Sequence, residues 1–185
     1  MKVDPITEVK HIRAIKKLLA ENPRDKLLFI MGVNSGMRVQ DLLQFRIKDV
    51  SHKAVGDRIT LRELKTGKEN VLIINQEIFD AIQSYLALDE HKDKDFLFKS
   101  RKGTNYPLST FRVMKMVKGW TDAVNLKGNF GAHTLRKTWC YMQRTKFGVS
   151  CEVIAKRLNH ANPAITRRYL GIKEEEVEEA LLHNI

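Results

Sequence analysis

Near the middle of the chain, the hydrophobic period of the sequence changes from helical to alternating in two short segments. Residues 58–65 and 70–75 have the character of β-strands, and residues 66–69 (TGKE) join them in the manner of a hairpin turn. On both sides of this pair, apolar residues recur every three or four positions, which is typical of amphipathic helices. A short strand is also expected near residues 48–55. The sequence therefore predicts an α+β fold, mainly helical, with one small three-stranded antiparallel sheet.

The other segments are predicted to be helices separated by turn signals. Asp4 is placed to cap the first helix, and Pro5 suits its first turn. Residues 96–98 are expected to form a short strand or turn. Helices are predicted over residues 6–18, 24–34, 39–45, 76–88, 108–124, 133–146, 150–158, 163–170 and, as an acidic amphipathic tail, 173–182. A chain of 185 residues is long enough for one well-buried domain.

The positive charge of the chain is concentrated in one part of the sequence. The formal net charge is +11. Residues 1–98 carry 17 Lys or Arg and 15 Asp or Glu, residues 99–173 carry 16 and 2, and residues 174–185 carry none and five. Cations near phosphates release condensed counterions, which gives basic proteins affinity for nucleic acids. An acidic membrane surface is the rival partner, but no basic amphipathic helix with an aromatic face stands out, so nucleic acid is favoured.

Other features of the sequence exclude several classes of protein. The longest uninterrupted apolar run, residues 27–33, is far shorter than the ~20 residues that a membrane-spanning helix needs. The first residues (MKVDPITEVKH) contain no apolar segment like that of a signal peptide. Cys140 and Cys151 have no paired spacing, which argues against a disulfide framework. We therefore expect a cytoplasmic protein with no membrane partner.

The basic segment also holds the densest group of chemically active side chains. His133 and Arg136 share one face of a predicted helix, His160 follows 24 residues after Arg136, and Tyr169 lies nine residues beyond His160. Upstream, Arg38 follows a Ser-Gly-Met turn. Arginine can clamp two phosphate oxygens, and histidine can donate a hydrogen bond or transfer a proton near neutral pH. This set predicts attack of a tyrosine hydroxyl on a DNA phosphodiester, with the other four groups stabilising the transition state.

A lysine in the hairpin turn could supply the proton that the departing 5′-oxygen needs. Lys65 is so placed, although Lys68 is close enough to compete for this role. A metal site built from His133, His160 and the cysteines is not expected, because these residues lack ligand spacing and the arginines would repel a cation.

In this order and spacing, the motifs resemble those of the tyrosine recombinases, also called the phage integrase family, in their catalytic domain. The resemblance runs from residue 6 to residue 172, and Asp41 matches an acidic position three residues after the family's first arginine. Asn159 departs from the pattern, because the family usually has glycine there. Six positions match the catalytic residues of the family: Arg38, Lys65, His133, Arg136, His160 and Tyr169.

The resemblance implies a site-specific DNA recombinase or integrase of bacterial or phage origin, with a catalytic domain over residues 1–172. Tyr169 would form a 3′-phosphotyrosyl intermediate, and Lys65 would act as the general acid. Arg38 and Arg136 would hold the non-bridging oxygens with help from His160, while His133 would be the proton-transfer partner. No metal ion or nucleotide cofactor is required by such a reaction.

The resemblance further implies double-stranded DNA as partner, a tetramer on DNA and accessory factors. The acidic tail, residues 173–185, would dock in trans on a neighbouring protomer through Val177 and Leu181. Other cations are expected to follow the DNA backbone: Arg101, Lys102, Arg112, Lys115, Lys118 and Lys137.

Most family members carry a helical core-binding domain of about a hundred residues before this point. Nothing in the sequence corresponds to it, so we expect either an excised catalytic domain or a naturally short integrase, and weaker DNA binding.

Two other functions remain open at this point. A DNA-binding regulator of the same fold would not cleave DNA and would have no need of Tyr169. A type IB topoisomerase would share the chemistry but would cut and reseal one strand. The tail that is available for a partner protomer favours recombination.

Overall fold

The computed structural model describes residues 3–88, 90–160, 162, 165, 166 and 182. The chain divides into two compact units, residues 1–139 and 140–185. The elements are α1 (Val9–Leu18), α2 (Pro23–Ser35), α3 (Val39–Leu42), α4 (Ile47–Val50), β1 (Arg58–Arg62), β2 (Glu69–Ile73), α5 (Gln76–Leu86), α6 (Thr110–Ala123), α7 (Ala132–Thr145) and α8 (Cys151–Arg157). The prediction of a mainly helical chain with a small antiparallel sheet is confirmed.

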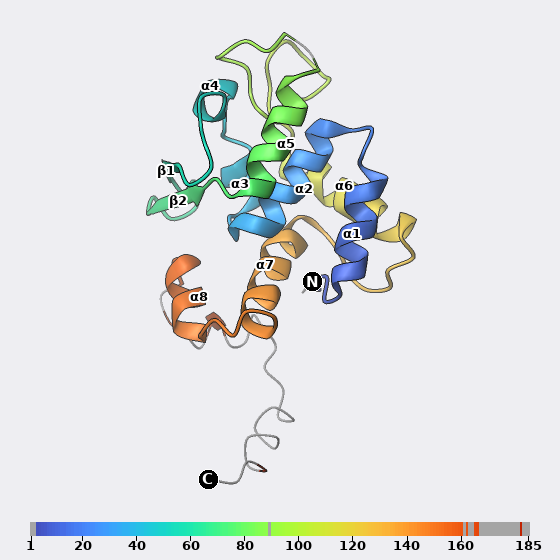
Figure 1. Ribbon diagram of the computed structural model, residues 1–185, viewed down its shortest axis with the longest axis vertical. Helices are drawn as coiled ribbons and strands as arrows, with labels where there is room; N and C mark the ends of the chain where they lie inside the picture. Colours follow the sequence, from blue (N-terminus) through green and yellow to red (C-terminus); the bar gives the residue numbers. More distant parts are fainter. Residues whose placement is uncertain (1–2, 89, 161, 163–164, 167–181, 183–185) are drawn as a thin grey trace. The chain divides into compact units, whose positions relative to one another are not determined.

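The core of the first unit is built around α2. Pro23 occupies the first turn of this helix, and every residue from Leu27 to Gly32 is buried. Figure 1 shows α2 in the middle of this unit with α1, α3 and α5 beside it. Phe29 of α2 meets Trp120 of α6 edge-to-face, with ring centroids 5.9 Å apart. Beyond its first turn, α2 is apolar on nearly all sides, as expected for a helix that other helices cover.

Two close contacts place α7 against the C-terminal half of α2. A Cβ on Gly32 would lie 2.6 Å from Cδ1 of Leu135, and a Cβ on Gly36 would lie 2.6 Å from Cε3 of Trp139. Each pair is spaced four residues apart along its own helix, so the two contacts lie one turn apart. Gly36 also caps α2 with a φ of 66°, a left-handed conformation that glycine adopts without a Cβ clash.

The hairpin is confirmed, and it forms a sheet of two strands. β1 and β2 are antiparallel, with Arg58 opposite Ile73 and Arg62 opposite Glu69. The turn is closed by hydrogen bonds from Glu63 N to Lys68 O and from Gly67 N to Glu63 O, both 2.9 Å. The hairpin thus positions residues 63–68 as an ordered turn.

The predicted third strand near residues 48–55 is wrong, because this segment begins with the short helix α4. The carboxylate of Asp49 accepts a hydrogen bond from Arg46 N (2.8 Å) and fixes the first turn, while Ile47 and Val50 are buried. Local capping and two apolar anchors therefore outweigh the strand character of the segment. Residues 96–98 add only an isolated bridge, between Phe96 and Arg46.

The predicted capping role of Asp4 is also wrong. α1 begins at Val9, and Asp4 instead pairs with Asn129: Asp4 N donates to Asn129 O (2.7 Å) and Asp4 Oδ2 accepts from Asn129 N (2.9 Å). These bonds connect the N-terminal segment to a loop of the same unit that is distant in sequence.

The second unit is described over the end of α7, the helix α8 and a few residues beyond it. Ser150 caps α8 by accepting a hydrogen bond from Val153 N, and Ile154 and Ala155 are buried. The predicted helix at 163–170 and the tail at 173–185 fall almost wholly outside the described residues. Among the helices that the structure describes, none has both the length and the apolar character to cross a membrane.

We predict that Gly36→Ala lowers the free energy of unfolding by about 2–4 kcal/mol. A left-handed φ costs an alanine about 1–2 kcal/mol, and overpacking against Trp139 adds about 1–3 kcal/mol. Gly119→Ala is the matched control, because Gly119 lies inside α6 with nothing within 4 Å of a Cβ. This control should be neutral or stabilising by up to about 1 kcal/mol. Equal denaturation midpoints for the two variants would contradict the proposed packing of α7 on α2.

Candidate active site

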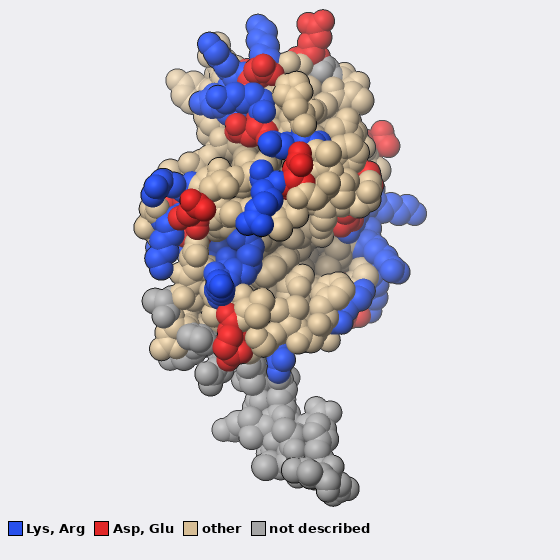
Figure 2. Space-filling model, turned by 60° about the vertical axis from the view of Figure 1, so that its left-hand side comes forward, with Lys and Arg blue, Asp and Glu red and all other residues tan. Residues whose placement is uncertain are grey.

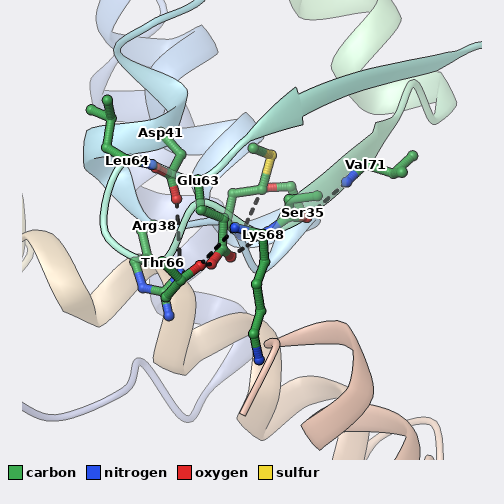
Figure 3. A network of polar contacts seen from close by, with 10 residues as sticks. Ser35, Arg38, Asp41, Glu63, Leu64, Thr66, Lys68 and Val71 are labelled. Carbon is green, nitrogen blue, oxygen red and sulfur yellow. Dashed lines mark hydrogen bonds and ion pairs between the residues drawn. The ribbon is translucent and has the colours of Figure 1, made fainter. Parts of the chain in front are cut away.

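Arg38 lies at the start of α3, directly after the turn that ends α2. Gly36 reverses the chain, and Ser35 Oγ accepts a hydrogen bond from Met37 N (3.2 Å) inside this turn. The side chain of Arg38 is 13% exposed, and its Nη1 lies 2.6 Å from Oε2 of Glu63 and 4.0 Å from Oδ2 of Asp41. Figure 3 shows the guanidinium facing the carboxylate of Glu63 at the base of the hairpin turn. The turn at Ser35 and Gly36 thus positions the backbone of Arg38, and Glu63 of the hairpin positions its guanidinium.

Glu63 is a buried acid with three hydrogen-bond donors. Besides Arg38, it accepts hydrogen bonds from Thr66 Oγ1 (2.5 Å) and Asn70 Nδ2 (2.7 Å). Burial alone would raise the pKa of Glu63, but the hydrogen bonds from Thr66, Arg38 and Asn70 outweigh it and lower the pKa to about 2. Glu63 is therefore charged at every physiological pH.

Asp41, one turn after Arg38, is fully buried. Its Oδ1 accepts a hydrogen bond from Leu64 N (3.0 Å). Burial raises the pKa of Asp41, the Leu64 bond lowers it, and the charge of Glu63 raises it while those of Arg38 and Arg136 lower it. The net effect is a raised pKa. The hydrogen bond from Leu64 N also connects the hairpin turn to α3.

The first two turns of α7 carry His133 and Arg136. Arg136 is one of the largest fully buried side chains, at 1% exposure. His133 keeps contact with solvent, yet its pKa is lowered, first by desolvation and then by the charges of Arg136, Arg38, Lys137 and Lys65. These charges come from three separate segments of the chain. The structure therefore places Arg38, Lys65 and Arg136 within electrostatic range of His133.

Lys65 is exposed and lies between two hydrogen-bonded neighbours. Leu64 N donates to Asp41, and Thr66 Oγ1 donates to Glu63. Lys68, the competing lysine, uses its backbone for the turn and is not among the charges that lower the pKa of His133. Of these two lysines, Lys65 is the one whose charge lowers the pKa of His133.

His160 belongs to the second unit, where a well-formed helix end holds it. After α8, Asn159 N donates to Lys156 O (3.2 Å) and His160 N donates to Ala155 O (3.1 Å), which is a Schellman motif. Its left-handed residue is Asn159, with a φ of 55°. Asparagine tolerates this conformation better than most side chains, which explains how it replaces the glycine expected there. The ring Nδ1 of His160 lies 2.9 Å from Thr166 Oγ1. Tyr169 lies outside the described residues.

Five of the six cations predicted to follow the DNA backbone lie between residues 101 and 118. Arg101, Lys102 and Arg112 line a cavity of about 790 Å³ together with Arg24. The ammonium of Lys115 lies 4.7 Å from the centroid of the Phe111 ring on α6. Lys137 differs, because it is buried on α7 and acts electrostatically on His133.

The surface is not uniformly basic. Figure 2 shows that lysine and arginine side chains lie among acidic ones on the face turned to the viewer. The cavity lined by Arg101 and Arg112 is likewise mixed in charge, because Asp25 also lines it and pairs with Arg24 (2.7 Å). Within the described ranges, no group of three or more His, Cys, Asp or Glu side chains could hold a metal ion.

Glu63 and Thr66 were not predicted as site residues. The available signal is positional: Glu63 continues the alternation of Ile59 and Leu61, so it places a charge where a partly buried side chain is expected. Thr166, the partner of His160, gives no comparable signal in the sequence.

Most of the chain is similar to a known family of proteins. The model of the phage integrase family matches residues 6–176. The chain belongs to this family. As a member of the phage integrase family, it is 36% identical over 176 residues to the probable integrase/recombinase YoeC of Bacillus subtilis, covering 94% of this chain and 92% of YoeC. It is 28% identical over 174 residues to the tyrosine recombinase XerA of Pyrococcus horikoshii, covering 94% of this chain and 58% of XerA.

Solved structures of the phage integrase family have the same fold. The crystal structure of XerA recombinase aligns with a TM-score of 0.77 at 21% identity, over 96% of this chain and 62% of that one. The catalytic domain of bacteriophage HP1 integrase aligns with a TM-score of 0.60 at 17% identity, over 98% of this chain and 95% of that domain. The chain therefore spans nearly all of YoeC and of the HP1 domain, but about three fifths of XerA.

We predict that the ring of His133 titrates below the ordinary histidine value of about 6.5, as measured by NMR on the DNA-free protein. Lys65→Met removes one of the charges that lower this pKa, so the midpoint should move upward. Lys68→Met is the matched control and should leave the midpoint in place. Equal shifts in both variants would contradict the placement of Lys65 beside His133.

Proposed function

We propose that this protein is a tyrosine-type DNA strand-transferase, a site-specific recombinase or integrase. The observation that supports this most strongly is the convergence of Arg38, Lys65, His133 and Arg136 in one unit of the fold, where buried carboxylates hold the first of them. Family membership and the 36% identity to YoeC over almost its whole length support the same reaction class.

The proposed reaction exchanges one phosphoester for another. The Tyr169 hydroxyl attacks the scissile phosphorus, the Tyr169 Oη–P bond forms, and the P–O5′ bond breaks. The phenolic proton passes to a base, and the leaving 5′-oxygen takes a proton from Lys65. The product is a 3′-phosphotyrosyl link with a free 5′-hydroxyl, which can reverse the step on a new strand without ATP.

Each residue has a role that its chemistry suits. Arg38 and Arg136 stabilise the charge on the non-bridging oxygens, and His160 assists them by hydrogen bonding. His133 is neutral at pH 7 because its pKa is lowered, so it can accept the phenolic proton. No metal ion or nucleotide is needed, because the arginines supply the positive charge.

The wider assembly is part of the proposal. Residues 1–172 would act as the catalytic domain on double-stranded DNA in the cytoplasm of a bacterial or phage-infected cell. Four protomers would assemble, with the tail at 173–185 docking in trans and accessory factors setting direction. The cations at 101–118 would contact backbone phosphates.

We predict that the wild-type protein forms a covalent adduct with a nicked suicide DNA substrate, seen on a denaturing gel, and does so in EDTA. Tyr169→Phe should abolish the adduct because the nucleophilic oxygen is gone, whereas Tyr141→Phe should retain it. If the wild type binds the DNA and traps none, the protein is a non-cleaving DNA-binding regulator. Relaxation of supercoiled plasmid without strand exchange would instead support the type IB topoisomerase.

We predict that Arg38→Lys lowers the rate of adduct formation about 10²–10³-fold with little change in DNA affinity, because it removes a preorganised donor fork. Arg58→Lys, at an exposed position of β1, is the matched control and should cleave at the wild-type rate. A loss of cleavage that merely tracks a loss of DNA binding would contradict the role of Arg38 in the transition state.

A further inference from the structure

The turn that carries Lys65 is held on both sides by carboxylates that also face Arg38. On one side, Leu64 N donates to Asp41 Oδ1 (3.0 Å), and Asp41 Oδ2 lies 4.0 Å from Arg38 Nη1. On the other side, Thr66 Oγ1 donates to Glu63 Oε2 (2.5 Å), the same oxygen that lies 2.6 Å from Arg38 Nη1. Figure 3 shows these contacts as one connected network.

Glu63 has more partners in this network than Asp41. Its carboxylate is 1% exposed and is also bonded by Asn70 from β2, so it connects both strands of the hairpin to α3. A buried carboxylate with three donors is strongly restrained, because moving any one donor exposes a buried charge. Glu63 is therefore the shorter of the two connections between the turn that presents Lys65 and the guanidinium of Arg38.

A lysine that delivers a proton requires such a restraint. The side chain of Lys65 is exposed, long and flexible, so its position depends on the turn that carries it. Proton transfer demands a donor within hydrogen-bond reach of the leaving oxygen, and the arginine already sets the position of the phosphate. A connection between Arg38 and the turn would keep the ammonium of Lys65 at a constant position relative to the phosphate.

We propose that Glu63, with Thr66, is a positioning residue that sets Lys65 relative to Arg38. The proposal rests on the proposed function, because it assigns Lys65 as the acid. It separates Glu63 from Asp41: Asp41 supports the start of the turn, whereas Glu63 connects the far side of the turn to the arginine. It also explains why Lys65, between the two attached residues, is favoured over Lys68.

The test compares two suicide DNA substrates, one with the natural 5′-oxygen and one with sulfur at the bridging 5′ position. When the P–S bond breaks, the leaving thiolate needs no proton, so a defect in the general acid is bypassed. On the oxygen substrate, Glu63→Gln and Thr66→Val should cleave at least tenfold more slowly than wild type. On the sulfur substrate, Lys65→Met and Thr66→Val should both recover to within about threefold of wild type, whereas Arg38→Lys should stay slow on both.

Two variants complete the comparison. Thr66→Ser keeps the hydroxyl and should restore most of the rate, and Thr60→Val, on an exposed position of β1, should match the wild type on both substrates. Wild-type rates for Thr66→Val and Glu63→Gln, or losses for both of equal size on the two substrates, would overturn the proposal.

A second measurement needs no DNA cleavage. In the DNA-free protein, hydrogen exchange at the amides of Leu64, Gly67 and Lys68 should be about tenfold faster in Thr66→Val than in wild type, which corresponds to the loss of one hydrogen bond to a charged group. If the wild type cleaves neither substrate, the proposed function fails, and the exchange result then decides whether Glu63 and Thr66 hold the turn. Unchanged exchange would overturn the positioning role.

Discussion

The ion pair between Arg38 and Glu63 is the interaction on which the rest of the site depends. A site that binds phosphate must gather cations, and cations at close range repel one another and lose hydration. The charges of Arg136, Arg38, Lys137 and Lys65 all lower the pKa of His133, so these cations gather around one side chain. Glu63 offsets this repulsion with a charge that its three donors keep ionised, since its pKa is about 2. The carboxylate of Glu63 is buried, so it stabilises the cluster from within the protein.

The backbone brings these groups together through simple packing rules. α2 ends at Gly36, whose left-handed conformation turns the chain directly into Arg38. Gly32 and Gly36 together leave room for Leu135 and Trp139, so α7 can lie close to α2. Arg136, the next residue of α7, is also buried. Two glycines four residues apart thus allow α7, which carries His133 and Arg136, to approach the end of α2 closely.

Much of this arrangement follows from the sequence, and the exceptions have physical reasons. The hairpin and most helices were predictable because alternating and helical periods differ clearly in segments such as 58–75 and 108–124. The prediction of a third strand was wrong because the hydrogen bond from Arg46 N to Asp49, which starts α4, cannot be recognised from the hydrophobic period. The predicted capping role of Asp4 was wrong because its partner, Asn129, is far away in sequence. Glu63 was missed for the same reason: its importance depends on Arg38, which belongs to another segment. Residue spacing predicted the cations of the candidate site, but not the carboxylate of Glu63 that pairs with Arg38.

Peptide mapping tests most directly whether Tyr169 forms the bond to DNA. Trypsin cuts after Arg168 and after Lys173, so the nucleophile falls in the peptide YLGIK, apart from every other tyrosine. After trapping on a suicide substrate and digestion with trypsin and nuclease, mass spectrometry should find a phosphonucleotide on Tyr169 in this peptide. Recovery of the modification on a peptide containing Tyr141, Tyr106 or Tyr85, or of cut DNA with no modified peptide, would contradict the account.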